Sequence, residues 1–254
     1  MVDEREMSDL GDKTFRELLR KTPTSGNISY NMAVRNVSDE ITRDLKYKHV
    51  DWEFVVFKSS VANAFALPGG KIGINTGLFK YIKNEAELAM VIGHEVTHVI
   101  ARHASEGYGR EIYSKVAGTA LQYSTEDKRI HDGYALLSHV GMTLRYSRAQ
   151  EYEADYIGLE LACKAGYPPE LAIKFFERLA QAGNSEKLEF LSTHPDTDKR
   201  IQRLRDNLDH FQEIYNNSPR KKYSPHQTQS PTNDSDAEIA RKVMQAYMEE
   251  HGNN

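Results

Sequence analysis

The feature that most constrains this chain is a five-residue motif placed inside an apolar stretch. The motif, His-Glu-Val-Thr-His, occupies residues 94–98 of a 254-residue chain. Apolar residues recur around it from Leu88 to Val99 at three- and four-residue spacing, which predicts a helix. Asn84 can cap that helix, and Glu87 stands where a capping box would close. The fold must therefore bury, on one helix, polar groups that are costly to bury without partners.

The spacing within the motif suits a metal ion. His94 and His98 lie four residues apart, so on a helix their rings stand one turn apart and both reach the same ion. Zinc fits that geometry. Glu95 falls on the neighbouring face, where its carboxylate can accept a proton from an activated water molecule instead of coordinating. We therefore predict one Zn²⁺ per chain, with Glu95 as the general base.

A catalytic zinc also needs a third protein ligand, and the acidic run Glu-Tyr-Glu-Ala-Asp at residues 151–155 offers one. If Glu151 binds the metal, Asp155 lies one turn on and can accept a hydrogen bond from a ligand histidine. Glu153 points to a different face, where we expect it to be solvated. The alternative is that all three acids merely decorate a helix surface. A metzincin site is excluded because it needs Gly at position 101 and His at 104, and both are alanine.

The rest of the chain predicts an α+β, mostly helical domain. An amphipathic helix is expected first, then a small antiparallel sheet with a turn at residues 68–70, then the motif helix, then a second long helix that ends before Gly166, and then further helices. The expected strands are 53–57, 62–67 and 71–76, and the expected helices, besides that of the motif, are 28–48, 134–164 with a possible break near Gly141, one from Pro168-Pro169, and 199–215.

These elements define one catalytic domain, residues 1–215, whose first 27 residues read as a polar leader. A Ser-, Pro- and Asn-rich stretch at 216–236 predicts a disordered linker, and 237–254 a short C-terminal helix or tail.

Composition excludes several functions. The formal net charge of −4 comes from 33 basic and 37 acidic residues scattered along the chain, so no basic face is ready to bind nucleic acid. The single cysteine, Cys163, permits neither an intrachain disulfide nor a cysteine-based zinc site. No run approaches the ~20 apolar residues that a membrane span needs, so we expect a soluble chain, and nothing in the sequence bears on its oligomeric state.

Four segments together resemble the gluzincin peptidases that include HtpX and the CAAX prenyl proteases. The likeness is strongest to the branch of the mitochondrial overlapping-activity proteases and their bacterial relatives, and it covers roughly residues 50–210. Four motifs in the right order are more specific than any one of them. The segments are Asn63–Gly77 (NAFALPGGKIGINTG), Gly93–His103 (GHEVTHVIARH), Glu151–Asp155 (EYEAD) and Ser192–Pro195 (STHP).

The resemblance implies a zincin-like domain in which His94, His98 and Glu151 are zinc ligands and Glu95 is the base. It also singles out His194 in the Thr-His-Pro segment. In such enzymes this histidine is assigned either to stabilising the oxyanion or to reversibly filling the open metal position. Taken alone, a histidine before proline is more often a loop residue.

The resemblance further implies that Asn63, Ala64, Phe65 and Ala66 form the edge strand along which a peptide substrate lies, although a plain core strand would read the same way. Arg102 could hold Glu151 or Asp155, and His103 lies off the ligand stripe; a surface charge and an ordinary polar histidine are the competing interpretations. Residues 105–128 could cover the cleft.

We therefore expect a zinc endopeptidase that cleaves protein or peptide substrates, in particular unfolded or misassembled proteins. One alternative is a latent peptidase whose fourth metal position is filled by His194 and which mainly binds clients. Another is a non-catalytic module with a structural zinc, but such a site has no use for Glu95. The resemblance favours a bacterial cell-envelope or periplasmic setting if a signal or anchor was trimmed, and a cytoplasmic one otherwise.

Overall fold

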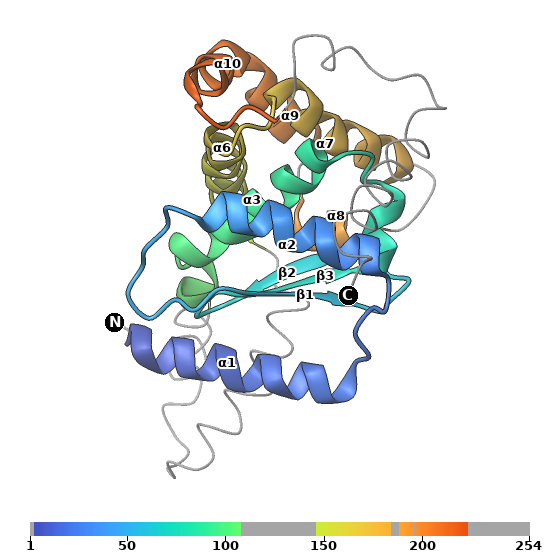
Figure 1. Cartoon of the computed structure of the whole chain (residues 1–254), viewed down its shortest axis with the longest axis vertical. Coiled ribbons are helices and arrows are strands. Elements are labelled where there is room, and N and C mark those ends of the chain that lie inside the picture. The colour runs from blue at the N-terminus through green and yellow to red at the C-terminus, as the bar shows by residue number, and fades with distance from the viewer. Residues whose placement is uncertain (1–2, 108–145, 184–187, 196, 223–254) are drawn as a thin grey trace, which may run out of the picture.

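A computed structural model describes residues 3–107, 146–183, 188–195 and 197–222. Within this part of the chain a small sheet lies between one helix on its lower face and two on its upper face, and most of the remaining helices gather beyond the upper layer (Figure 1). The helices are α1 Glu4–Lys21, α2 Ile28–Thr42, α3 Glu85–Ile100, α6 Arg148–Lys164, α7 Pro169–Gly183, α8 Glu189–Thr193, α9 Thr197–Asp206 and α10 Leu208–Asn217. The strands are β1 Glu53–Phe57, β2 Ala64–Leu67 and β3 Lys71–Asn75, followed by the 3₁₀ helix η1 Thr76–Lys80.

The sheet is mixed, so the expectation of an antiparallel sheet is wrong for one of its two pairings. The strand order is β1-β3-β2, with β2 antiparallel to β3 and β1 parallel to it. The predicted turn joins β2 to β3, and both Gly69 and Gly70 adopt a left-handed φ there, which glycine allows without strain. After the hairpin turn, β3 lies between β1 and β2 and runs in the same direction as β1. Strand β2 is consequently left at the edge.

Alternation along β2 divides the core in two. Phe65 and Leu67 face α1, and Ala64 and Ala66 belong to the large cluster on the α3 side. Because alanine side chains are small, α3 can pack close to the strand. The edge strand and the motif helix are therefore neighbours.

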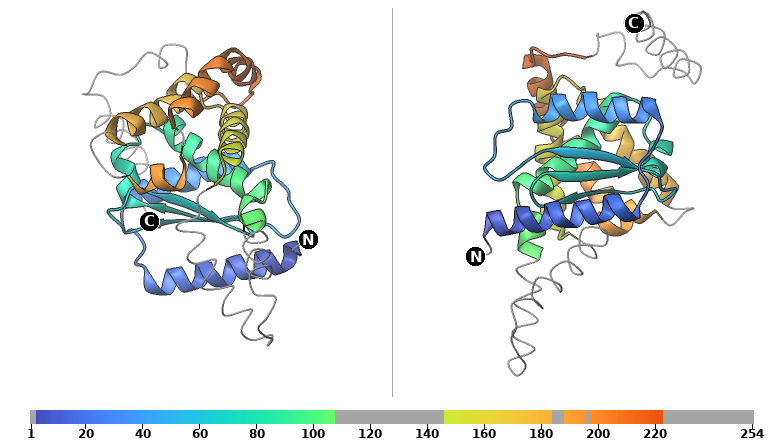
Figure 2. Two further views of the ribbon diagram at one scale, coloured as in Figure 1. Left: turned by 180° about the vertical axis from the view of Figure 1, so that it is seen from behind. Right: turned by 60° about the horizontal axis from the view of Figure 1, so that its bottom comes forward.

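The predicted polar leader is instead the helix α1, which packs against the lower face of the sheet (Figure 2). Its apolar stripe includes Met7, Phe15 and Leu18, which pack with the downward-facing residues of the sheet. A Cβ on Gly11 would overlap the carbonyl oxygen of Pro68, so α1 sits directly on the β2–β3 turn. The stripe is narrow and surrounded by charge, which is why composition alone reads this segment as a leader.

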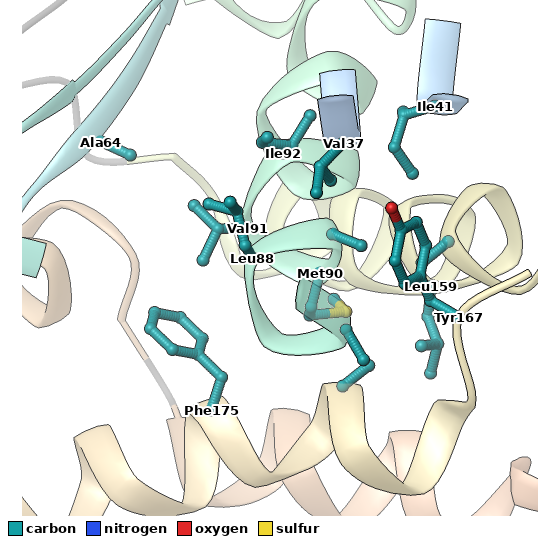
Figure 3. Close-up of a cluster of buried hydrophobic side chains, with 14 of the residues drawn as sticks. Val37, Ile41, Ala64, Leu88, Met90, Val91, Ile92, Leu159, Tyr167 and Phe175 are labelled. Carbon is teal, nitrogen blue, oxygen red and sulfur yellow. The ribbon is translucent and has the colours of Figure 1, made fainter. Parts of the chain in front are cut away.

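Helix α3 runs through the middle of the domain and is buried from Ala86 to Val99. Leu88, Met90, Val91 and Ile92 meet side chains of α2, β2, α6 and α7 in one continuous cluster (Figure 3). The predicted cap is present, because Asn84 Oδ1 accepts the Glu87 backbone N–H at 3.0 Å. The expected second half of the capping box is not: Glu87 accepts from the backbone of Lys83 and is held by Arg178.

Other boundaries differ from the prediction in detail. The first helix after the leader ends at Thr42, and the charged helix expected at 199–215 is two helices separated at Asn207. Helix α6 begins after a Ser147 capping box, while the earlier part of its expected range lies outside the described residues. Most of the expected cover at 105–128, most of the expected linker at 216–236 and the whole expected tail at 237–254 also lie outside them. In the described part of the chain, no helix is both long and apolar enough to cross a membrane.

Candidate metal centre

Four buried side chains from three helical elements converge at one point. They are His94 and His98 on α3, Glu151 on α6 and His194 at the C-cap of α8, and their candidate ligand atoms all lie within 4.8 Å of one another. All four are 0–1% exposed. The three ligands expected from the sequence are therefore brought together, and the Thr-His-Pro histidine joins them.

A glycine pair sets the distance between the two main helices of the site. A Cβ on Gly93 would overlap the carbonyl oxygen of Gly158, and a Cβ on Gly158 would fall within 2.7 Å of the His94 backbone nitrogen. Helices α3 and α6 therefore touch backbone to backbone. Glu151 lies two turns before Gly158 on the same face of α6, so this contact aims its carboxylate at the histidines of α3.

His94 is held by a charged pair. Its Nδ1 lies 2.9 Å from Asp155 Oδ1, and Arg200 donates to both oxygens of Asp155 at 2.6 and 2.7 Å. Burial, the largest single influence, raises the pKa of Asp155, but the charge and hydrogen bonds of Arg200 together with the contact to His94 outweigh it and lower that pKa to about 2. An ionised Asp155 only accepts, so His94 carries its proton on Nδ1 and presents the Nε2 lone pair to the centre.

Arg200, which was not predicted from the sequence, contacts several residues of the site at once. Its Nη1 lies 2.8 Å from Glu151 Oε2 and donates to the His194 carbonyl at 2.9 Å, and its guanidinium lies 4.7 Å from the centre of the Phe176 ring. The charges of α9 read as a solvated surface, yet Arg200 is 1% exposed. The only hint in the sequence is its position six residues after His194.

The contact expected of Arg102 is made by Arg200 instead. Arg102 is 59% exposed on its side chain and pairs with Glu4 of α1, so it holds neither Glu151 nor Asp155. The reason is backbone geometry. Helix α3 ends at Ile100, and Arg102 has a φ of +60°, which turns the chain back and directs its side chain outward.

His98 is surrounded by aromatic rings, and two of its contacts were not expected. The ring of Tyr146 stacks on it with centroids 3.7 Å apart and an interplanar angle of 14°. His103 Nδ1 lies 2.8 Å from His98 Nδ1, and His103 Nε2 lies 3.3 Å from Glu153 Oε2. Glu153, expected to be solvated, is half-exposed, and it contacts His103, which in turn contacts the candidate ligand His98. Burial, then the neighbouring His94, holds the pKa of His98 well below its usual value.

Glu95 is fully buried, and among the described residues neither of its carboxylate oxygens has a hydrogen-bond partner. Nε2 of His194 lies 3.6 Å from Glu95 Oε1. Burial raises the pKa of Glu95 above its ordinary value. A carboxylate in this state is suited to accepting a proton, as a general base must.

His194 lies between the candidate ligands and Glu95. Its Nδ1 is 3.0 Å from His94 Nε2 and 3.1 Å from Glu151 Oε1. Burial, the largest single influence, lowers the pKa of His194, but the carboxylates of Glu151 and Glu95 together leave that pKa raised. In Glu151 the balance is similar: burial raises its pKa, while His194 and Arg200 bring it below the usual value.

The donor set fits zinc. His94 Nε2 and His98 Nε2 face each other at 3.0 Å, and both face the Glu151 carboxylate at 3.6 Å. Because the His94 proton lies on Nδ1, the lone pair of its Nε2 points toward His98 Nε2 and the Glu151 carboxylate, which are also electron-rich. A cation between these atoms would stabilise the arrangement. Two imidazoles and one carboxylate are the ligand set of many catalytic zinc sites.

The segment expected to bind substrate is linked to this centre through α8. Ala64, Phe65 and Ala66 lie in β2 at the edge of the sheet. Asn63 precedes them, and its backbone carbonyl accepts the Asn75 backbone N–H at 2.9 Å. Just before it, Ala62 accepts the backbone N–H of Phe190, which lies four residues before His194 on α8. The strand is thus tied to the element that carries His194.

Comparisons with known proteins agree with this geometry. The family model described as Peptidase family M48 matches residues 29–208, a range that contains every candidate ligand. The mitochondrial metalloendopeptidase OMA1 of Arabidopsis thaliana is 39% identical over 155 residues, covering 61% of this chain and 31% of the relative. OMA1 of Schizosaccharomyces pombe is 35% identical over 202 residues, 78% of this chain and 56% of the relative. The beta-barrel assembly-enhancing protease of Escherichia coli K12 is 26% identical over 203 residues, 76% of this chain and 42% of the relative. The chain thus spans from 31% to 56% of the length of these relatives.

Proposed function

The chain belongs to peptidase family M48, and from that premise we propose that it is a zinc-dependent endopeptidase acting on unfolded or misassembled proteins. The observation that carries the proposal is the pairing of a two-histidine, one-carboxylate cluster with a buried carboxylate, Glu95, that has no hydrogen-bond partner among the described residues. A structural metal site would not need such a group.

Each residue of the centre has a separate task in this reaction. His94, His98 and Glu151 would hold the metal, which would supply the positive charge that polarises the scissile carbonyl and activates water. Glu95 accepts the proton of the attacking water and delivers it to the leaving amine. The imidazole of His194 donates a hydrogen bond to the oxygen that becomes negative, and Arg200 keeps Glu151 and the His194 backbone in place.

The edge strand β2 would hold the substrate. An extended peptide can add to the free edge of a sheet through main-chain hydrogen bonds, which demand little of its sequence. Such binding suits unfolded segments better than folded domains. The relatives are named for mitochondria and for β-barrel assembly, and we propose a comparable setting for this chain, the bacterial cell envelope or its mitochondrial counterpart.

Cleavage of casein, an unfolded protein, tests the proposal. Zinc-loaded wild type is expected to cleave it, and Glu95→Gln is expected to lose cleavage while its zinc content stays at one per chain. Glu160→Gln, the same chemical change at a residue that pairs with Lys164 away from the centre, is the matched control and should cleave like wild type. Equal cleavage by wild type and the Glu95 variant would refute the role of Glu95.

A second function is favoured by the position of His194. Its Nδ1 lies as close to His94 and Glu151 as a fourth ligand would, so the chain could be a latent peptidase that mainly binds clients. In that case zinc-loaded wild type would not cleave casein, and His194→Ala would. If His194 stabilises the oxyanion instead, the same change would lower cleavage by about 10²–10³-fold.

A further inference from the structure

His103 reaches His98 only because the helix ends between them. On a continuous helix a residue five positions on would lie roughly 140° around the axis from His98 and could not face it. Here α3 ends at Ile100, and the left-handed Arg102 turns the chain back. The His103 ring consequently returns to a position 5.0 Å, centre to centre, from the His98 ring and is 1% exposed.

The hydrogen bonds of His103 fix where its proton lies. Its Nε2 faces the Glu153 carboxylate at 3.3 Å, and an ionised carboxylate only accepts, so Nε2 carries the proton. Nδ1 of the neutral ring is then bare. The 2.8 Å contact between the two Nδ1 atoms is a hydrogen bond only if His98 supplies the proton. His98 therefore keeps its Nδ1–H and turns the lone pair of Nε2 toward the cluster.

We propose that Glu153 and His103 form a relay that sets the tautomer and ring orientation of His98 for metal binding. Both are positioning residues, since neither is among the candidate metal ligands and both act through His98. Tyr146, stacked on the face of the His98 ring, restricts its tilt, while the relay determines which nitrogen faces inward. The inference rests on the proposed metal site but not on peptidase activity, so its test reads zinc affinity.

The test compares zinc dissociation constants, measured by competition with a chromophoric chelator. His103→Leu removes the acceptor and is expected to weaken zinc binding by about 10–100-fold. His103→Gln keeps an amide oxygen that can accept from His98 and is expected to recover most of the affinity. Glu160→Gln, on the same helix as Glu153, should bind zinc like wild type.

A parallel pair at position 153 covers the case in which the His103 variants fail to fold, because Glu153 is 51% exposed on its side chain. Glu153→Leu leaves His103 free to change tautomer and should weaken zinc binding several-fold. Glu153→Gln still offers an acceptor and should stay within about twofold of wild type.

Two results would overturn the relay: wild-type affinity in both leucine variants, or equal losses in the leucine and glutamine variants of each pair, which would mean that size and packing matter rather than the hydrogen bond. A wild-type protein that binds no zinc would be a different failure. It would refute the proposed function and remove the premise of the relay with it.

Discussion

The two histidines of the motif lie one turn apart on the same helix, yet they are supported in opposite ways. Behind His94 stands a fully buried ion pair, Asp155 with Arg200, which also reaches Glu151. Behind His98 stands the neutral ring of His103, and behind that the half-exposed Glu153. The support of His94 is charged and fully buried, whereas the support of His98 begins with a neutral ring and ends at a carboxylate that is exposed to solvent.

This contrast indicates which side of the centre contributes more to the free energy of unfolding. A buried ion pair gains little when intact but is costly to break, because a charge is then left unpaired out of water. A neutral hydrogen bond that leads to a solvated carboxylate can be partly replaced by water. We therefore expect the His94 side to dominate folding stability and the His98 side to matter mainly for metal binding.

The largest expected effect comes from Arg200→Met, which leaves Asp155 and Glu151 without their shared partner. The free energy of unfolding should fall by about 3–5 kcal/mol, measured by urea unfolding in the presence of a chelator. Arg205→Met breaks the exposed pair of Arg205 with Glu177 nearby and should cost about 1 kcal/mol or less. Similar losses in the two variants would contradict the account of a buried charged support.

The pH dependence of stability gives a smaller effect of known sign. Because Arg200 holds the pKa of folded Asp155 near 2, below its ordinary value of 3.8, this carboxylate stabilises the fold above about pH 4. The stabilisation, on the order of 2 kcal/mol, is lost as the pH falls from about 4 to 2. The stability gap between metal-free wild type and Asp155→Asn should therefore shrink across that range. A gap that stays constant would show that Asp155 is not ionised by its partner.

The smallest effect sharpens the His98 side of the comparison. Arg102 holds a left-handed φ of +60°, which costs a non-glycine residue about 1 kcal/mol. Arg102→Gly removes that strain and should be more stable than Arg102→Ala in thermal unfolding, although both lose the pair with Glu4. Neither should change zinc affinity, since Arg102 touches no candidate ligand. An alanine variant as stable as the glycine one would contradict the strain.

Relations within one helix were readable from the sequence. The four-residue spacing of His94 and His98 and that of Glu151 and Asp155 follow from the helical repeat, and the structure places all four where the spacing predicts. Between elements, the meeting of Glu151 with the two histidines was expected from the ligand set that zinc needs and from the resemblance, but contacts without such a chemical reason were not readable. That Arg200 would turn inward depends on how α9 packs, which no local pattern determines.

The remaining errors have the same origin. A left-handed arginine is uncommon, so the turn at Arg102 and the return of His103 to His98 had no signal in the sequence. Whether β1 pairs in parallel or antiparallel depends on which strand of the β2–β3 hairpin lies next to it. The short strands carry no sequence signal for that choice. Helix α1 was missed because its stripe is narrow.

The most direct test of the account is anomalous X-ray diffraction at the zinc edge from crystals grown with zinc. The account predicts one ion per chain, bound by Nε2 of His94, Nε2 of His98 and the Glu151 carboxylate, with His103 Nδ1 still beside His98 Nδ1. An anomalous peak elsewhere, no peak at the cluster, or a His98 bound through Nδ1 would contradict it.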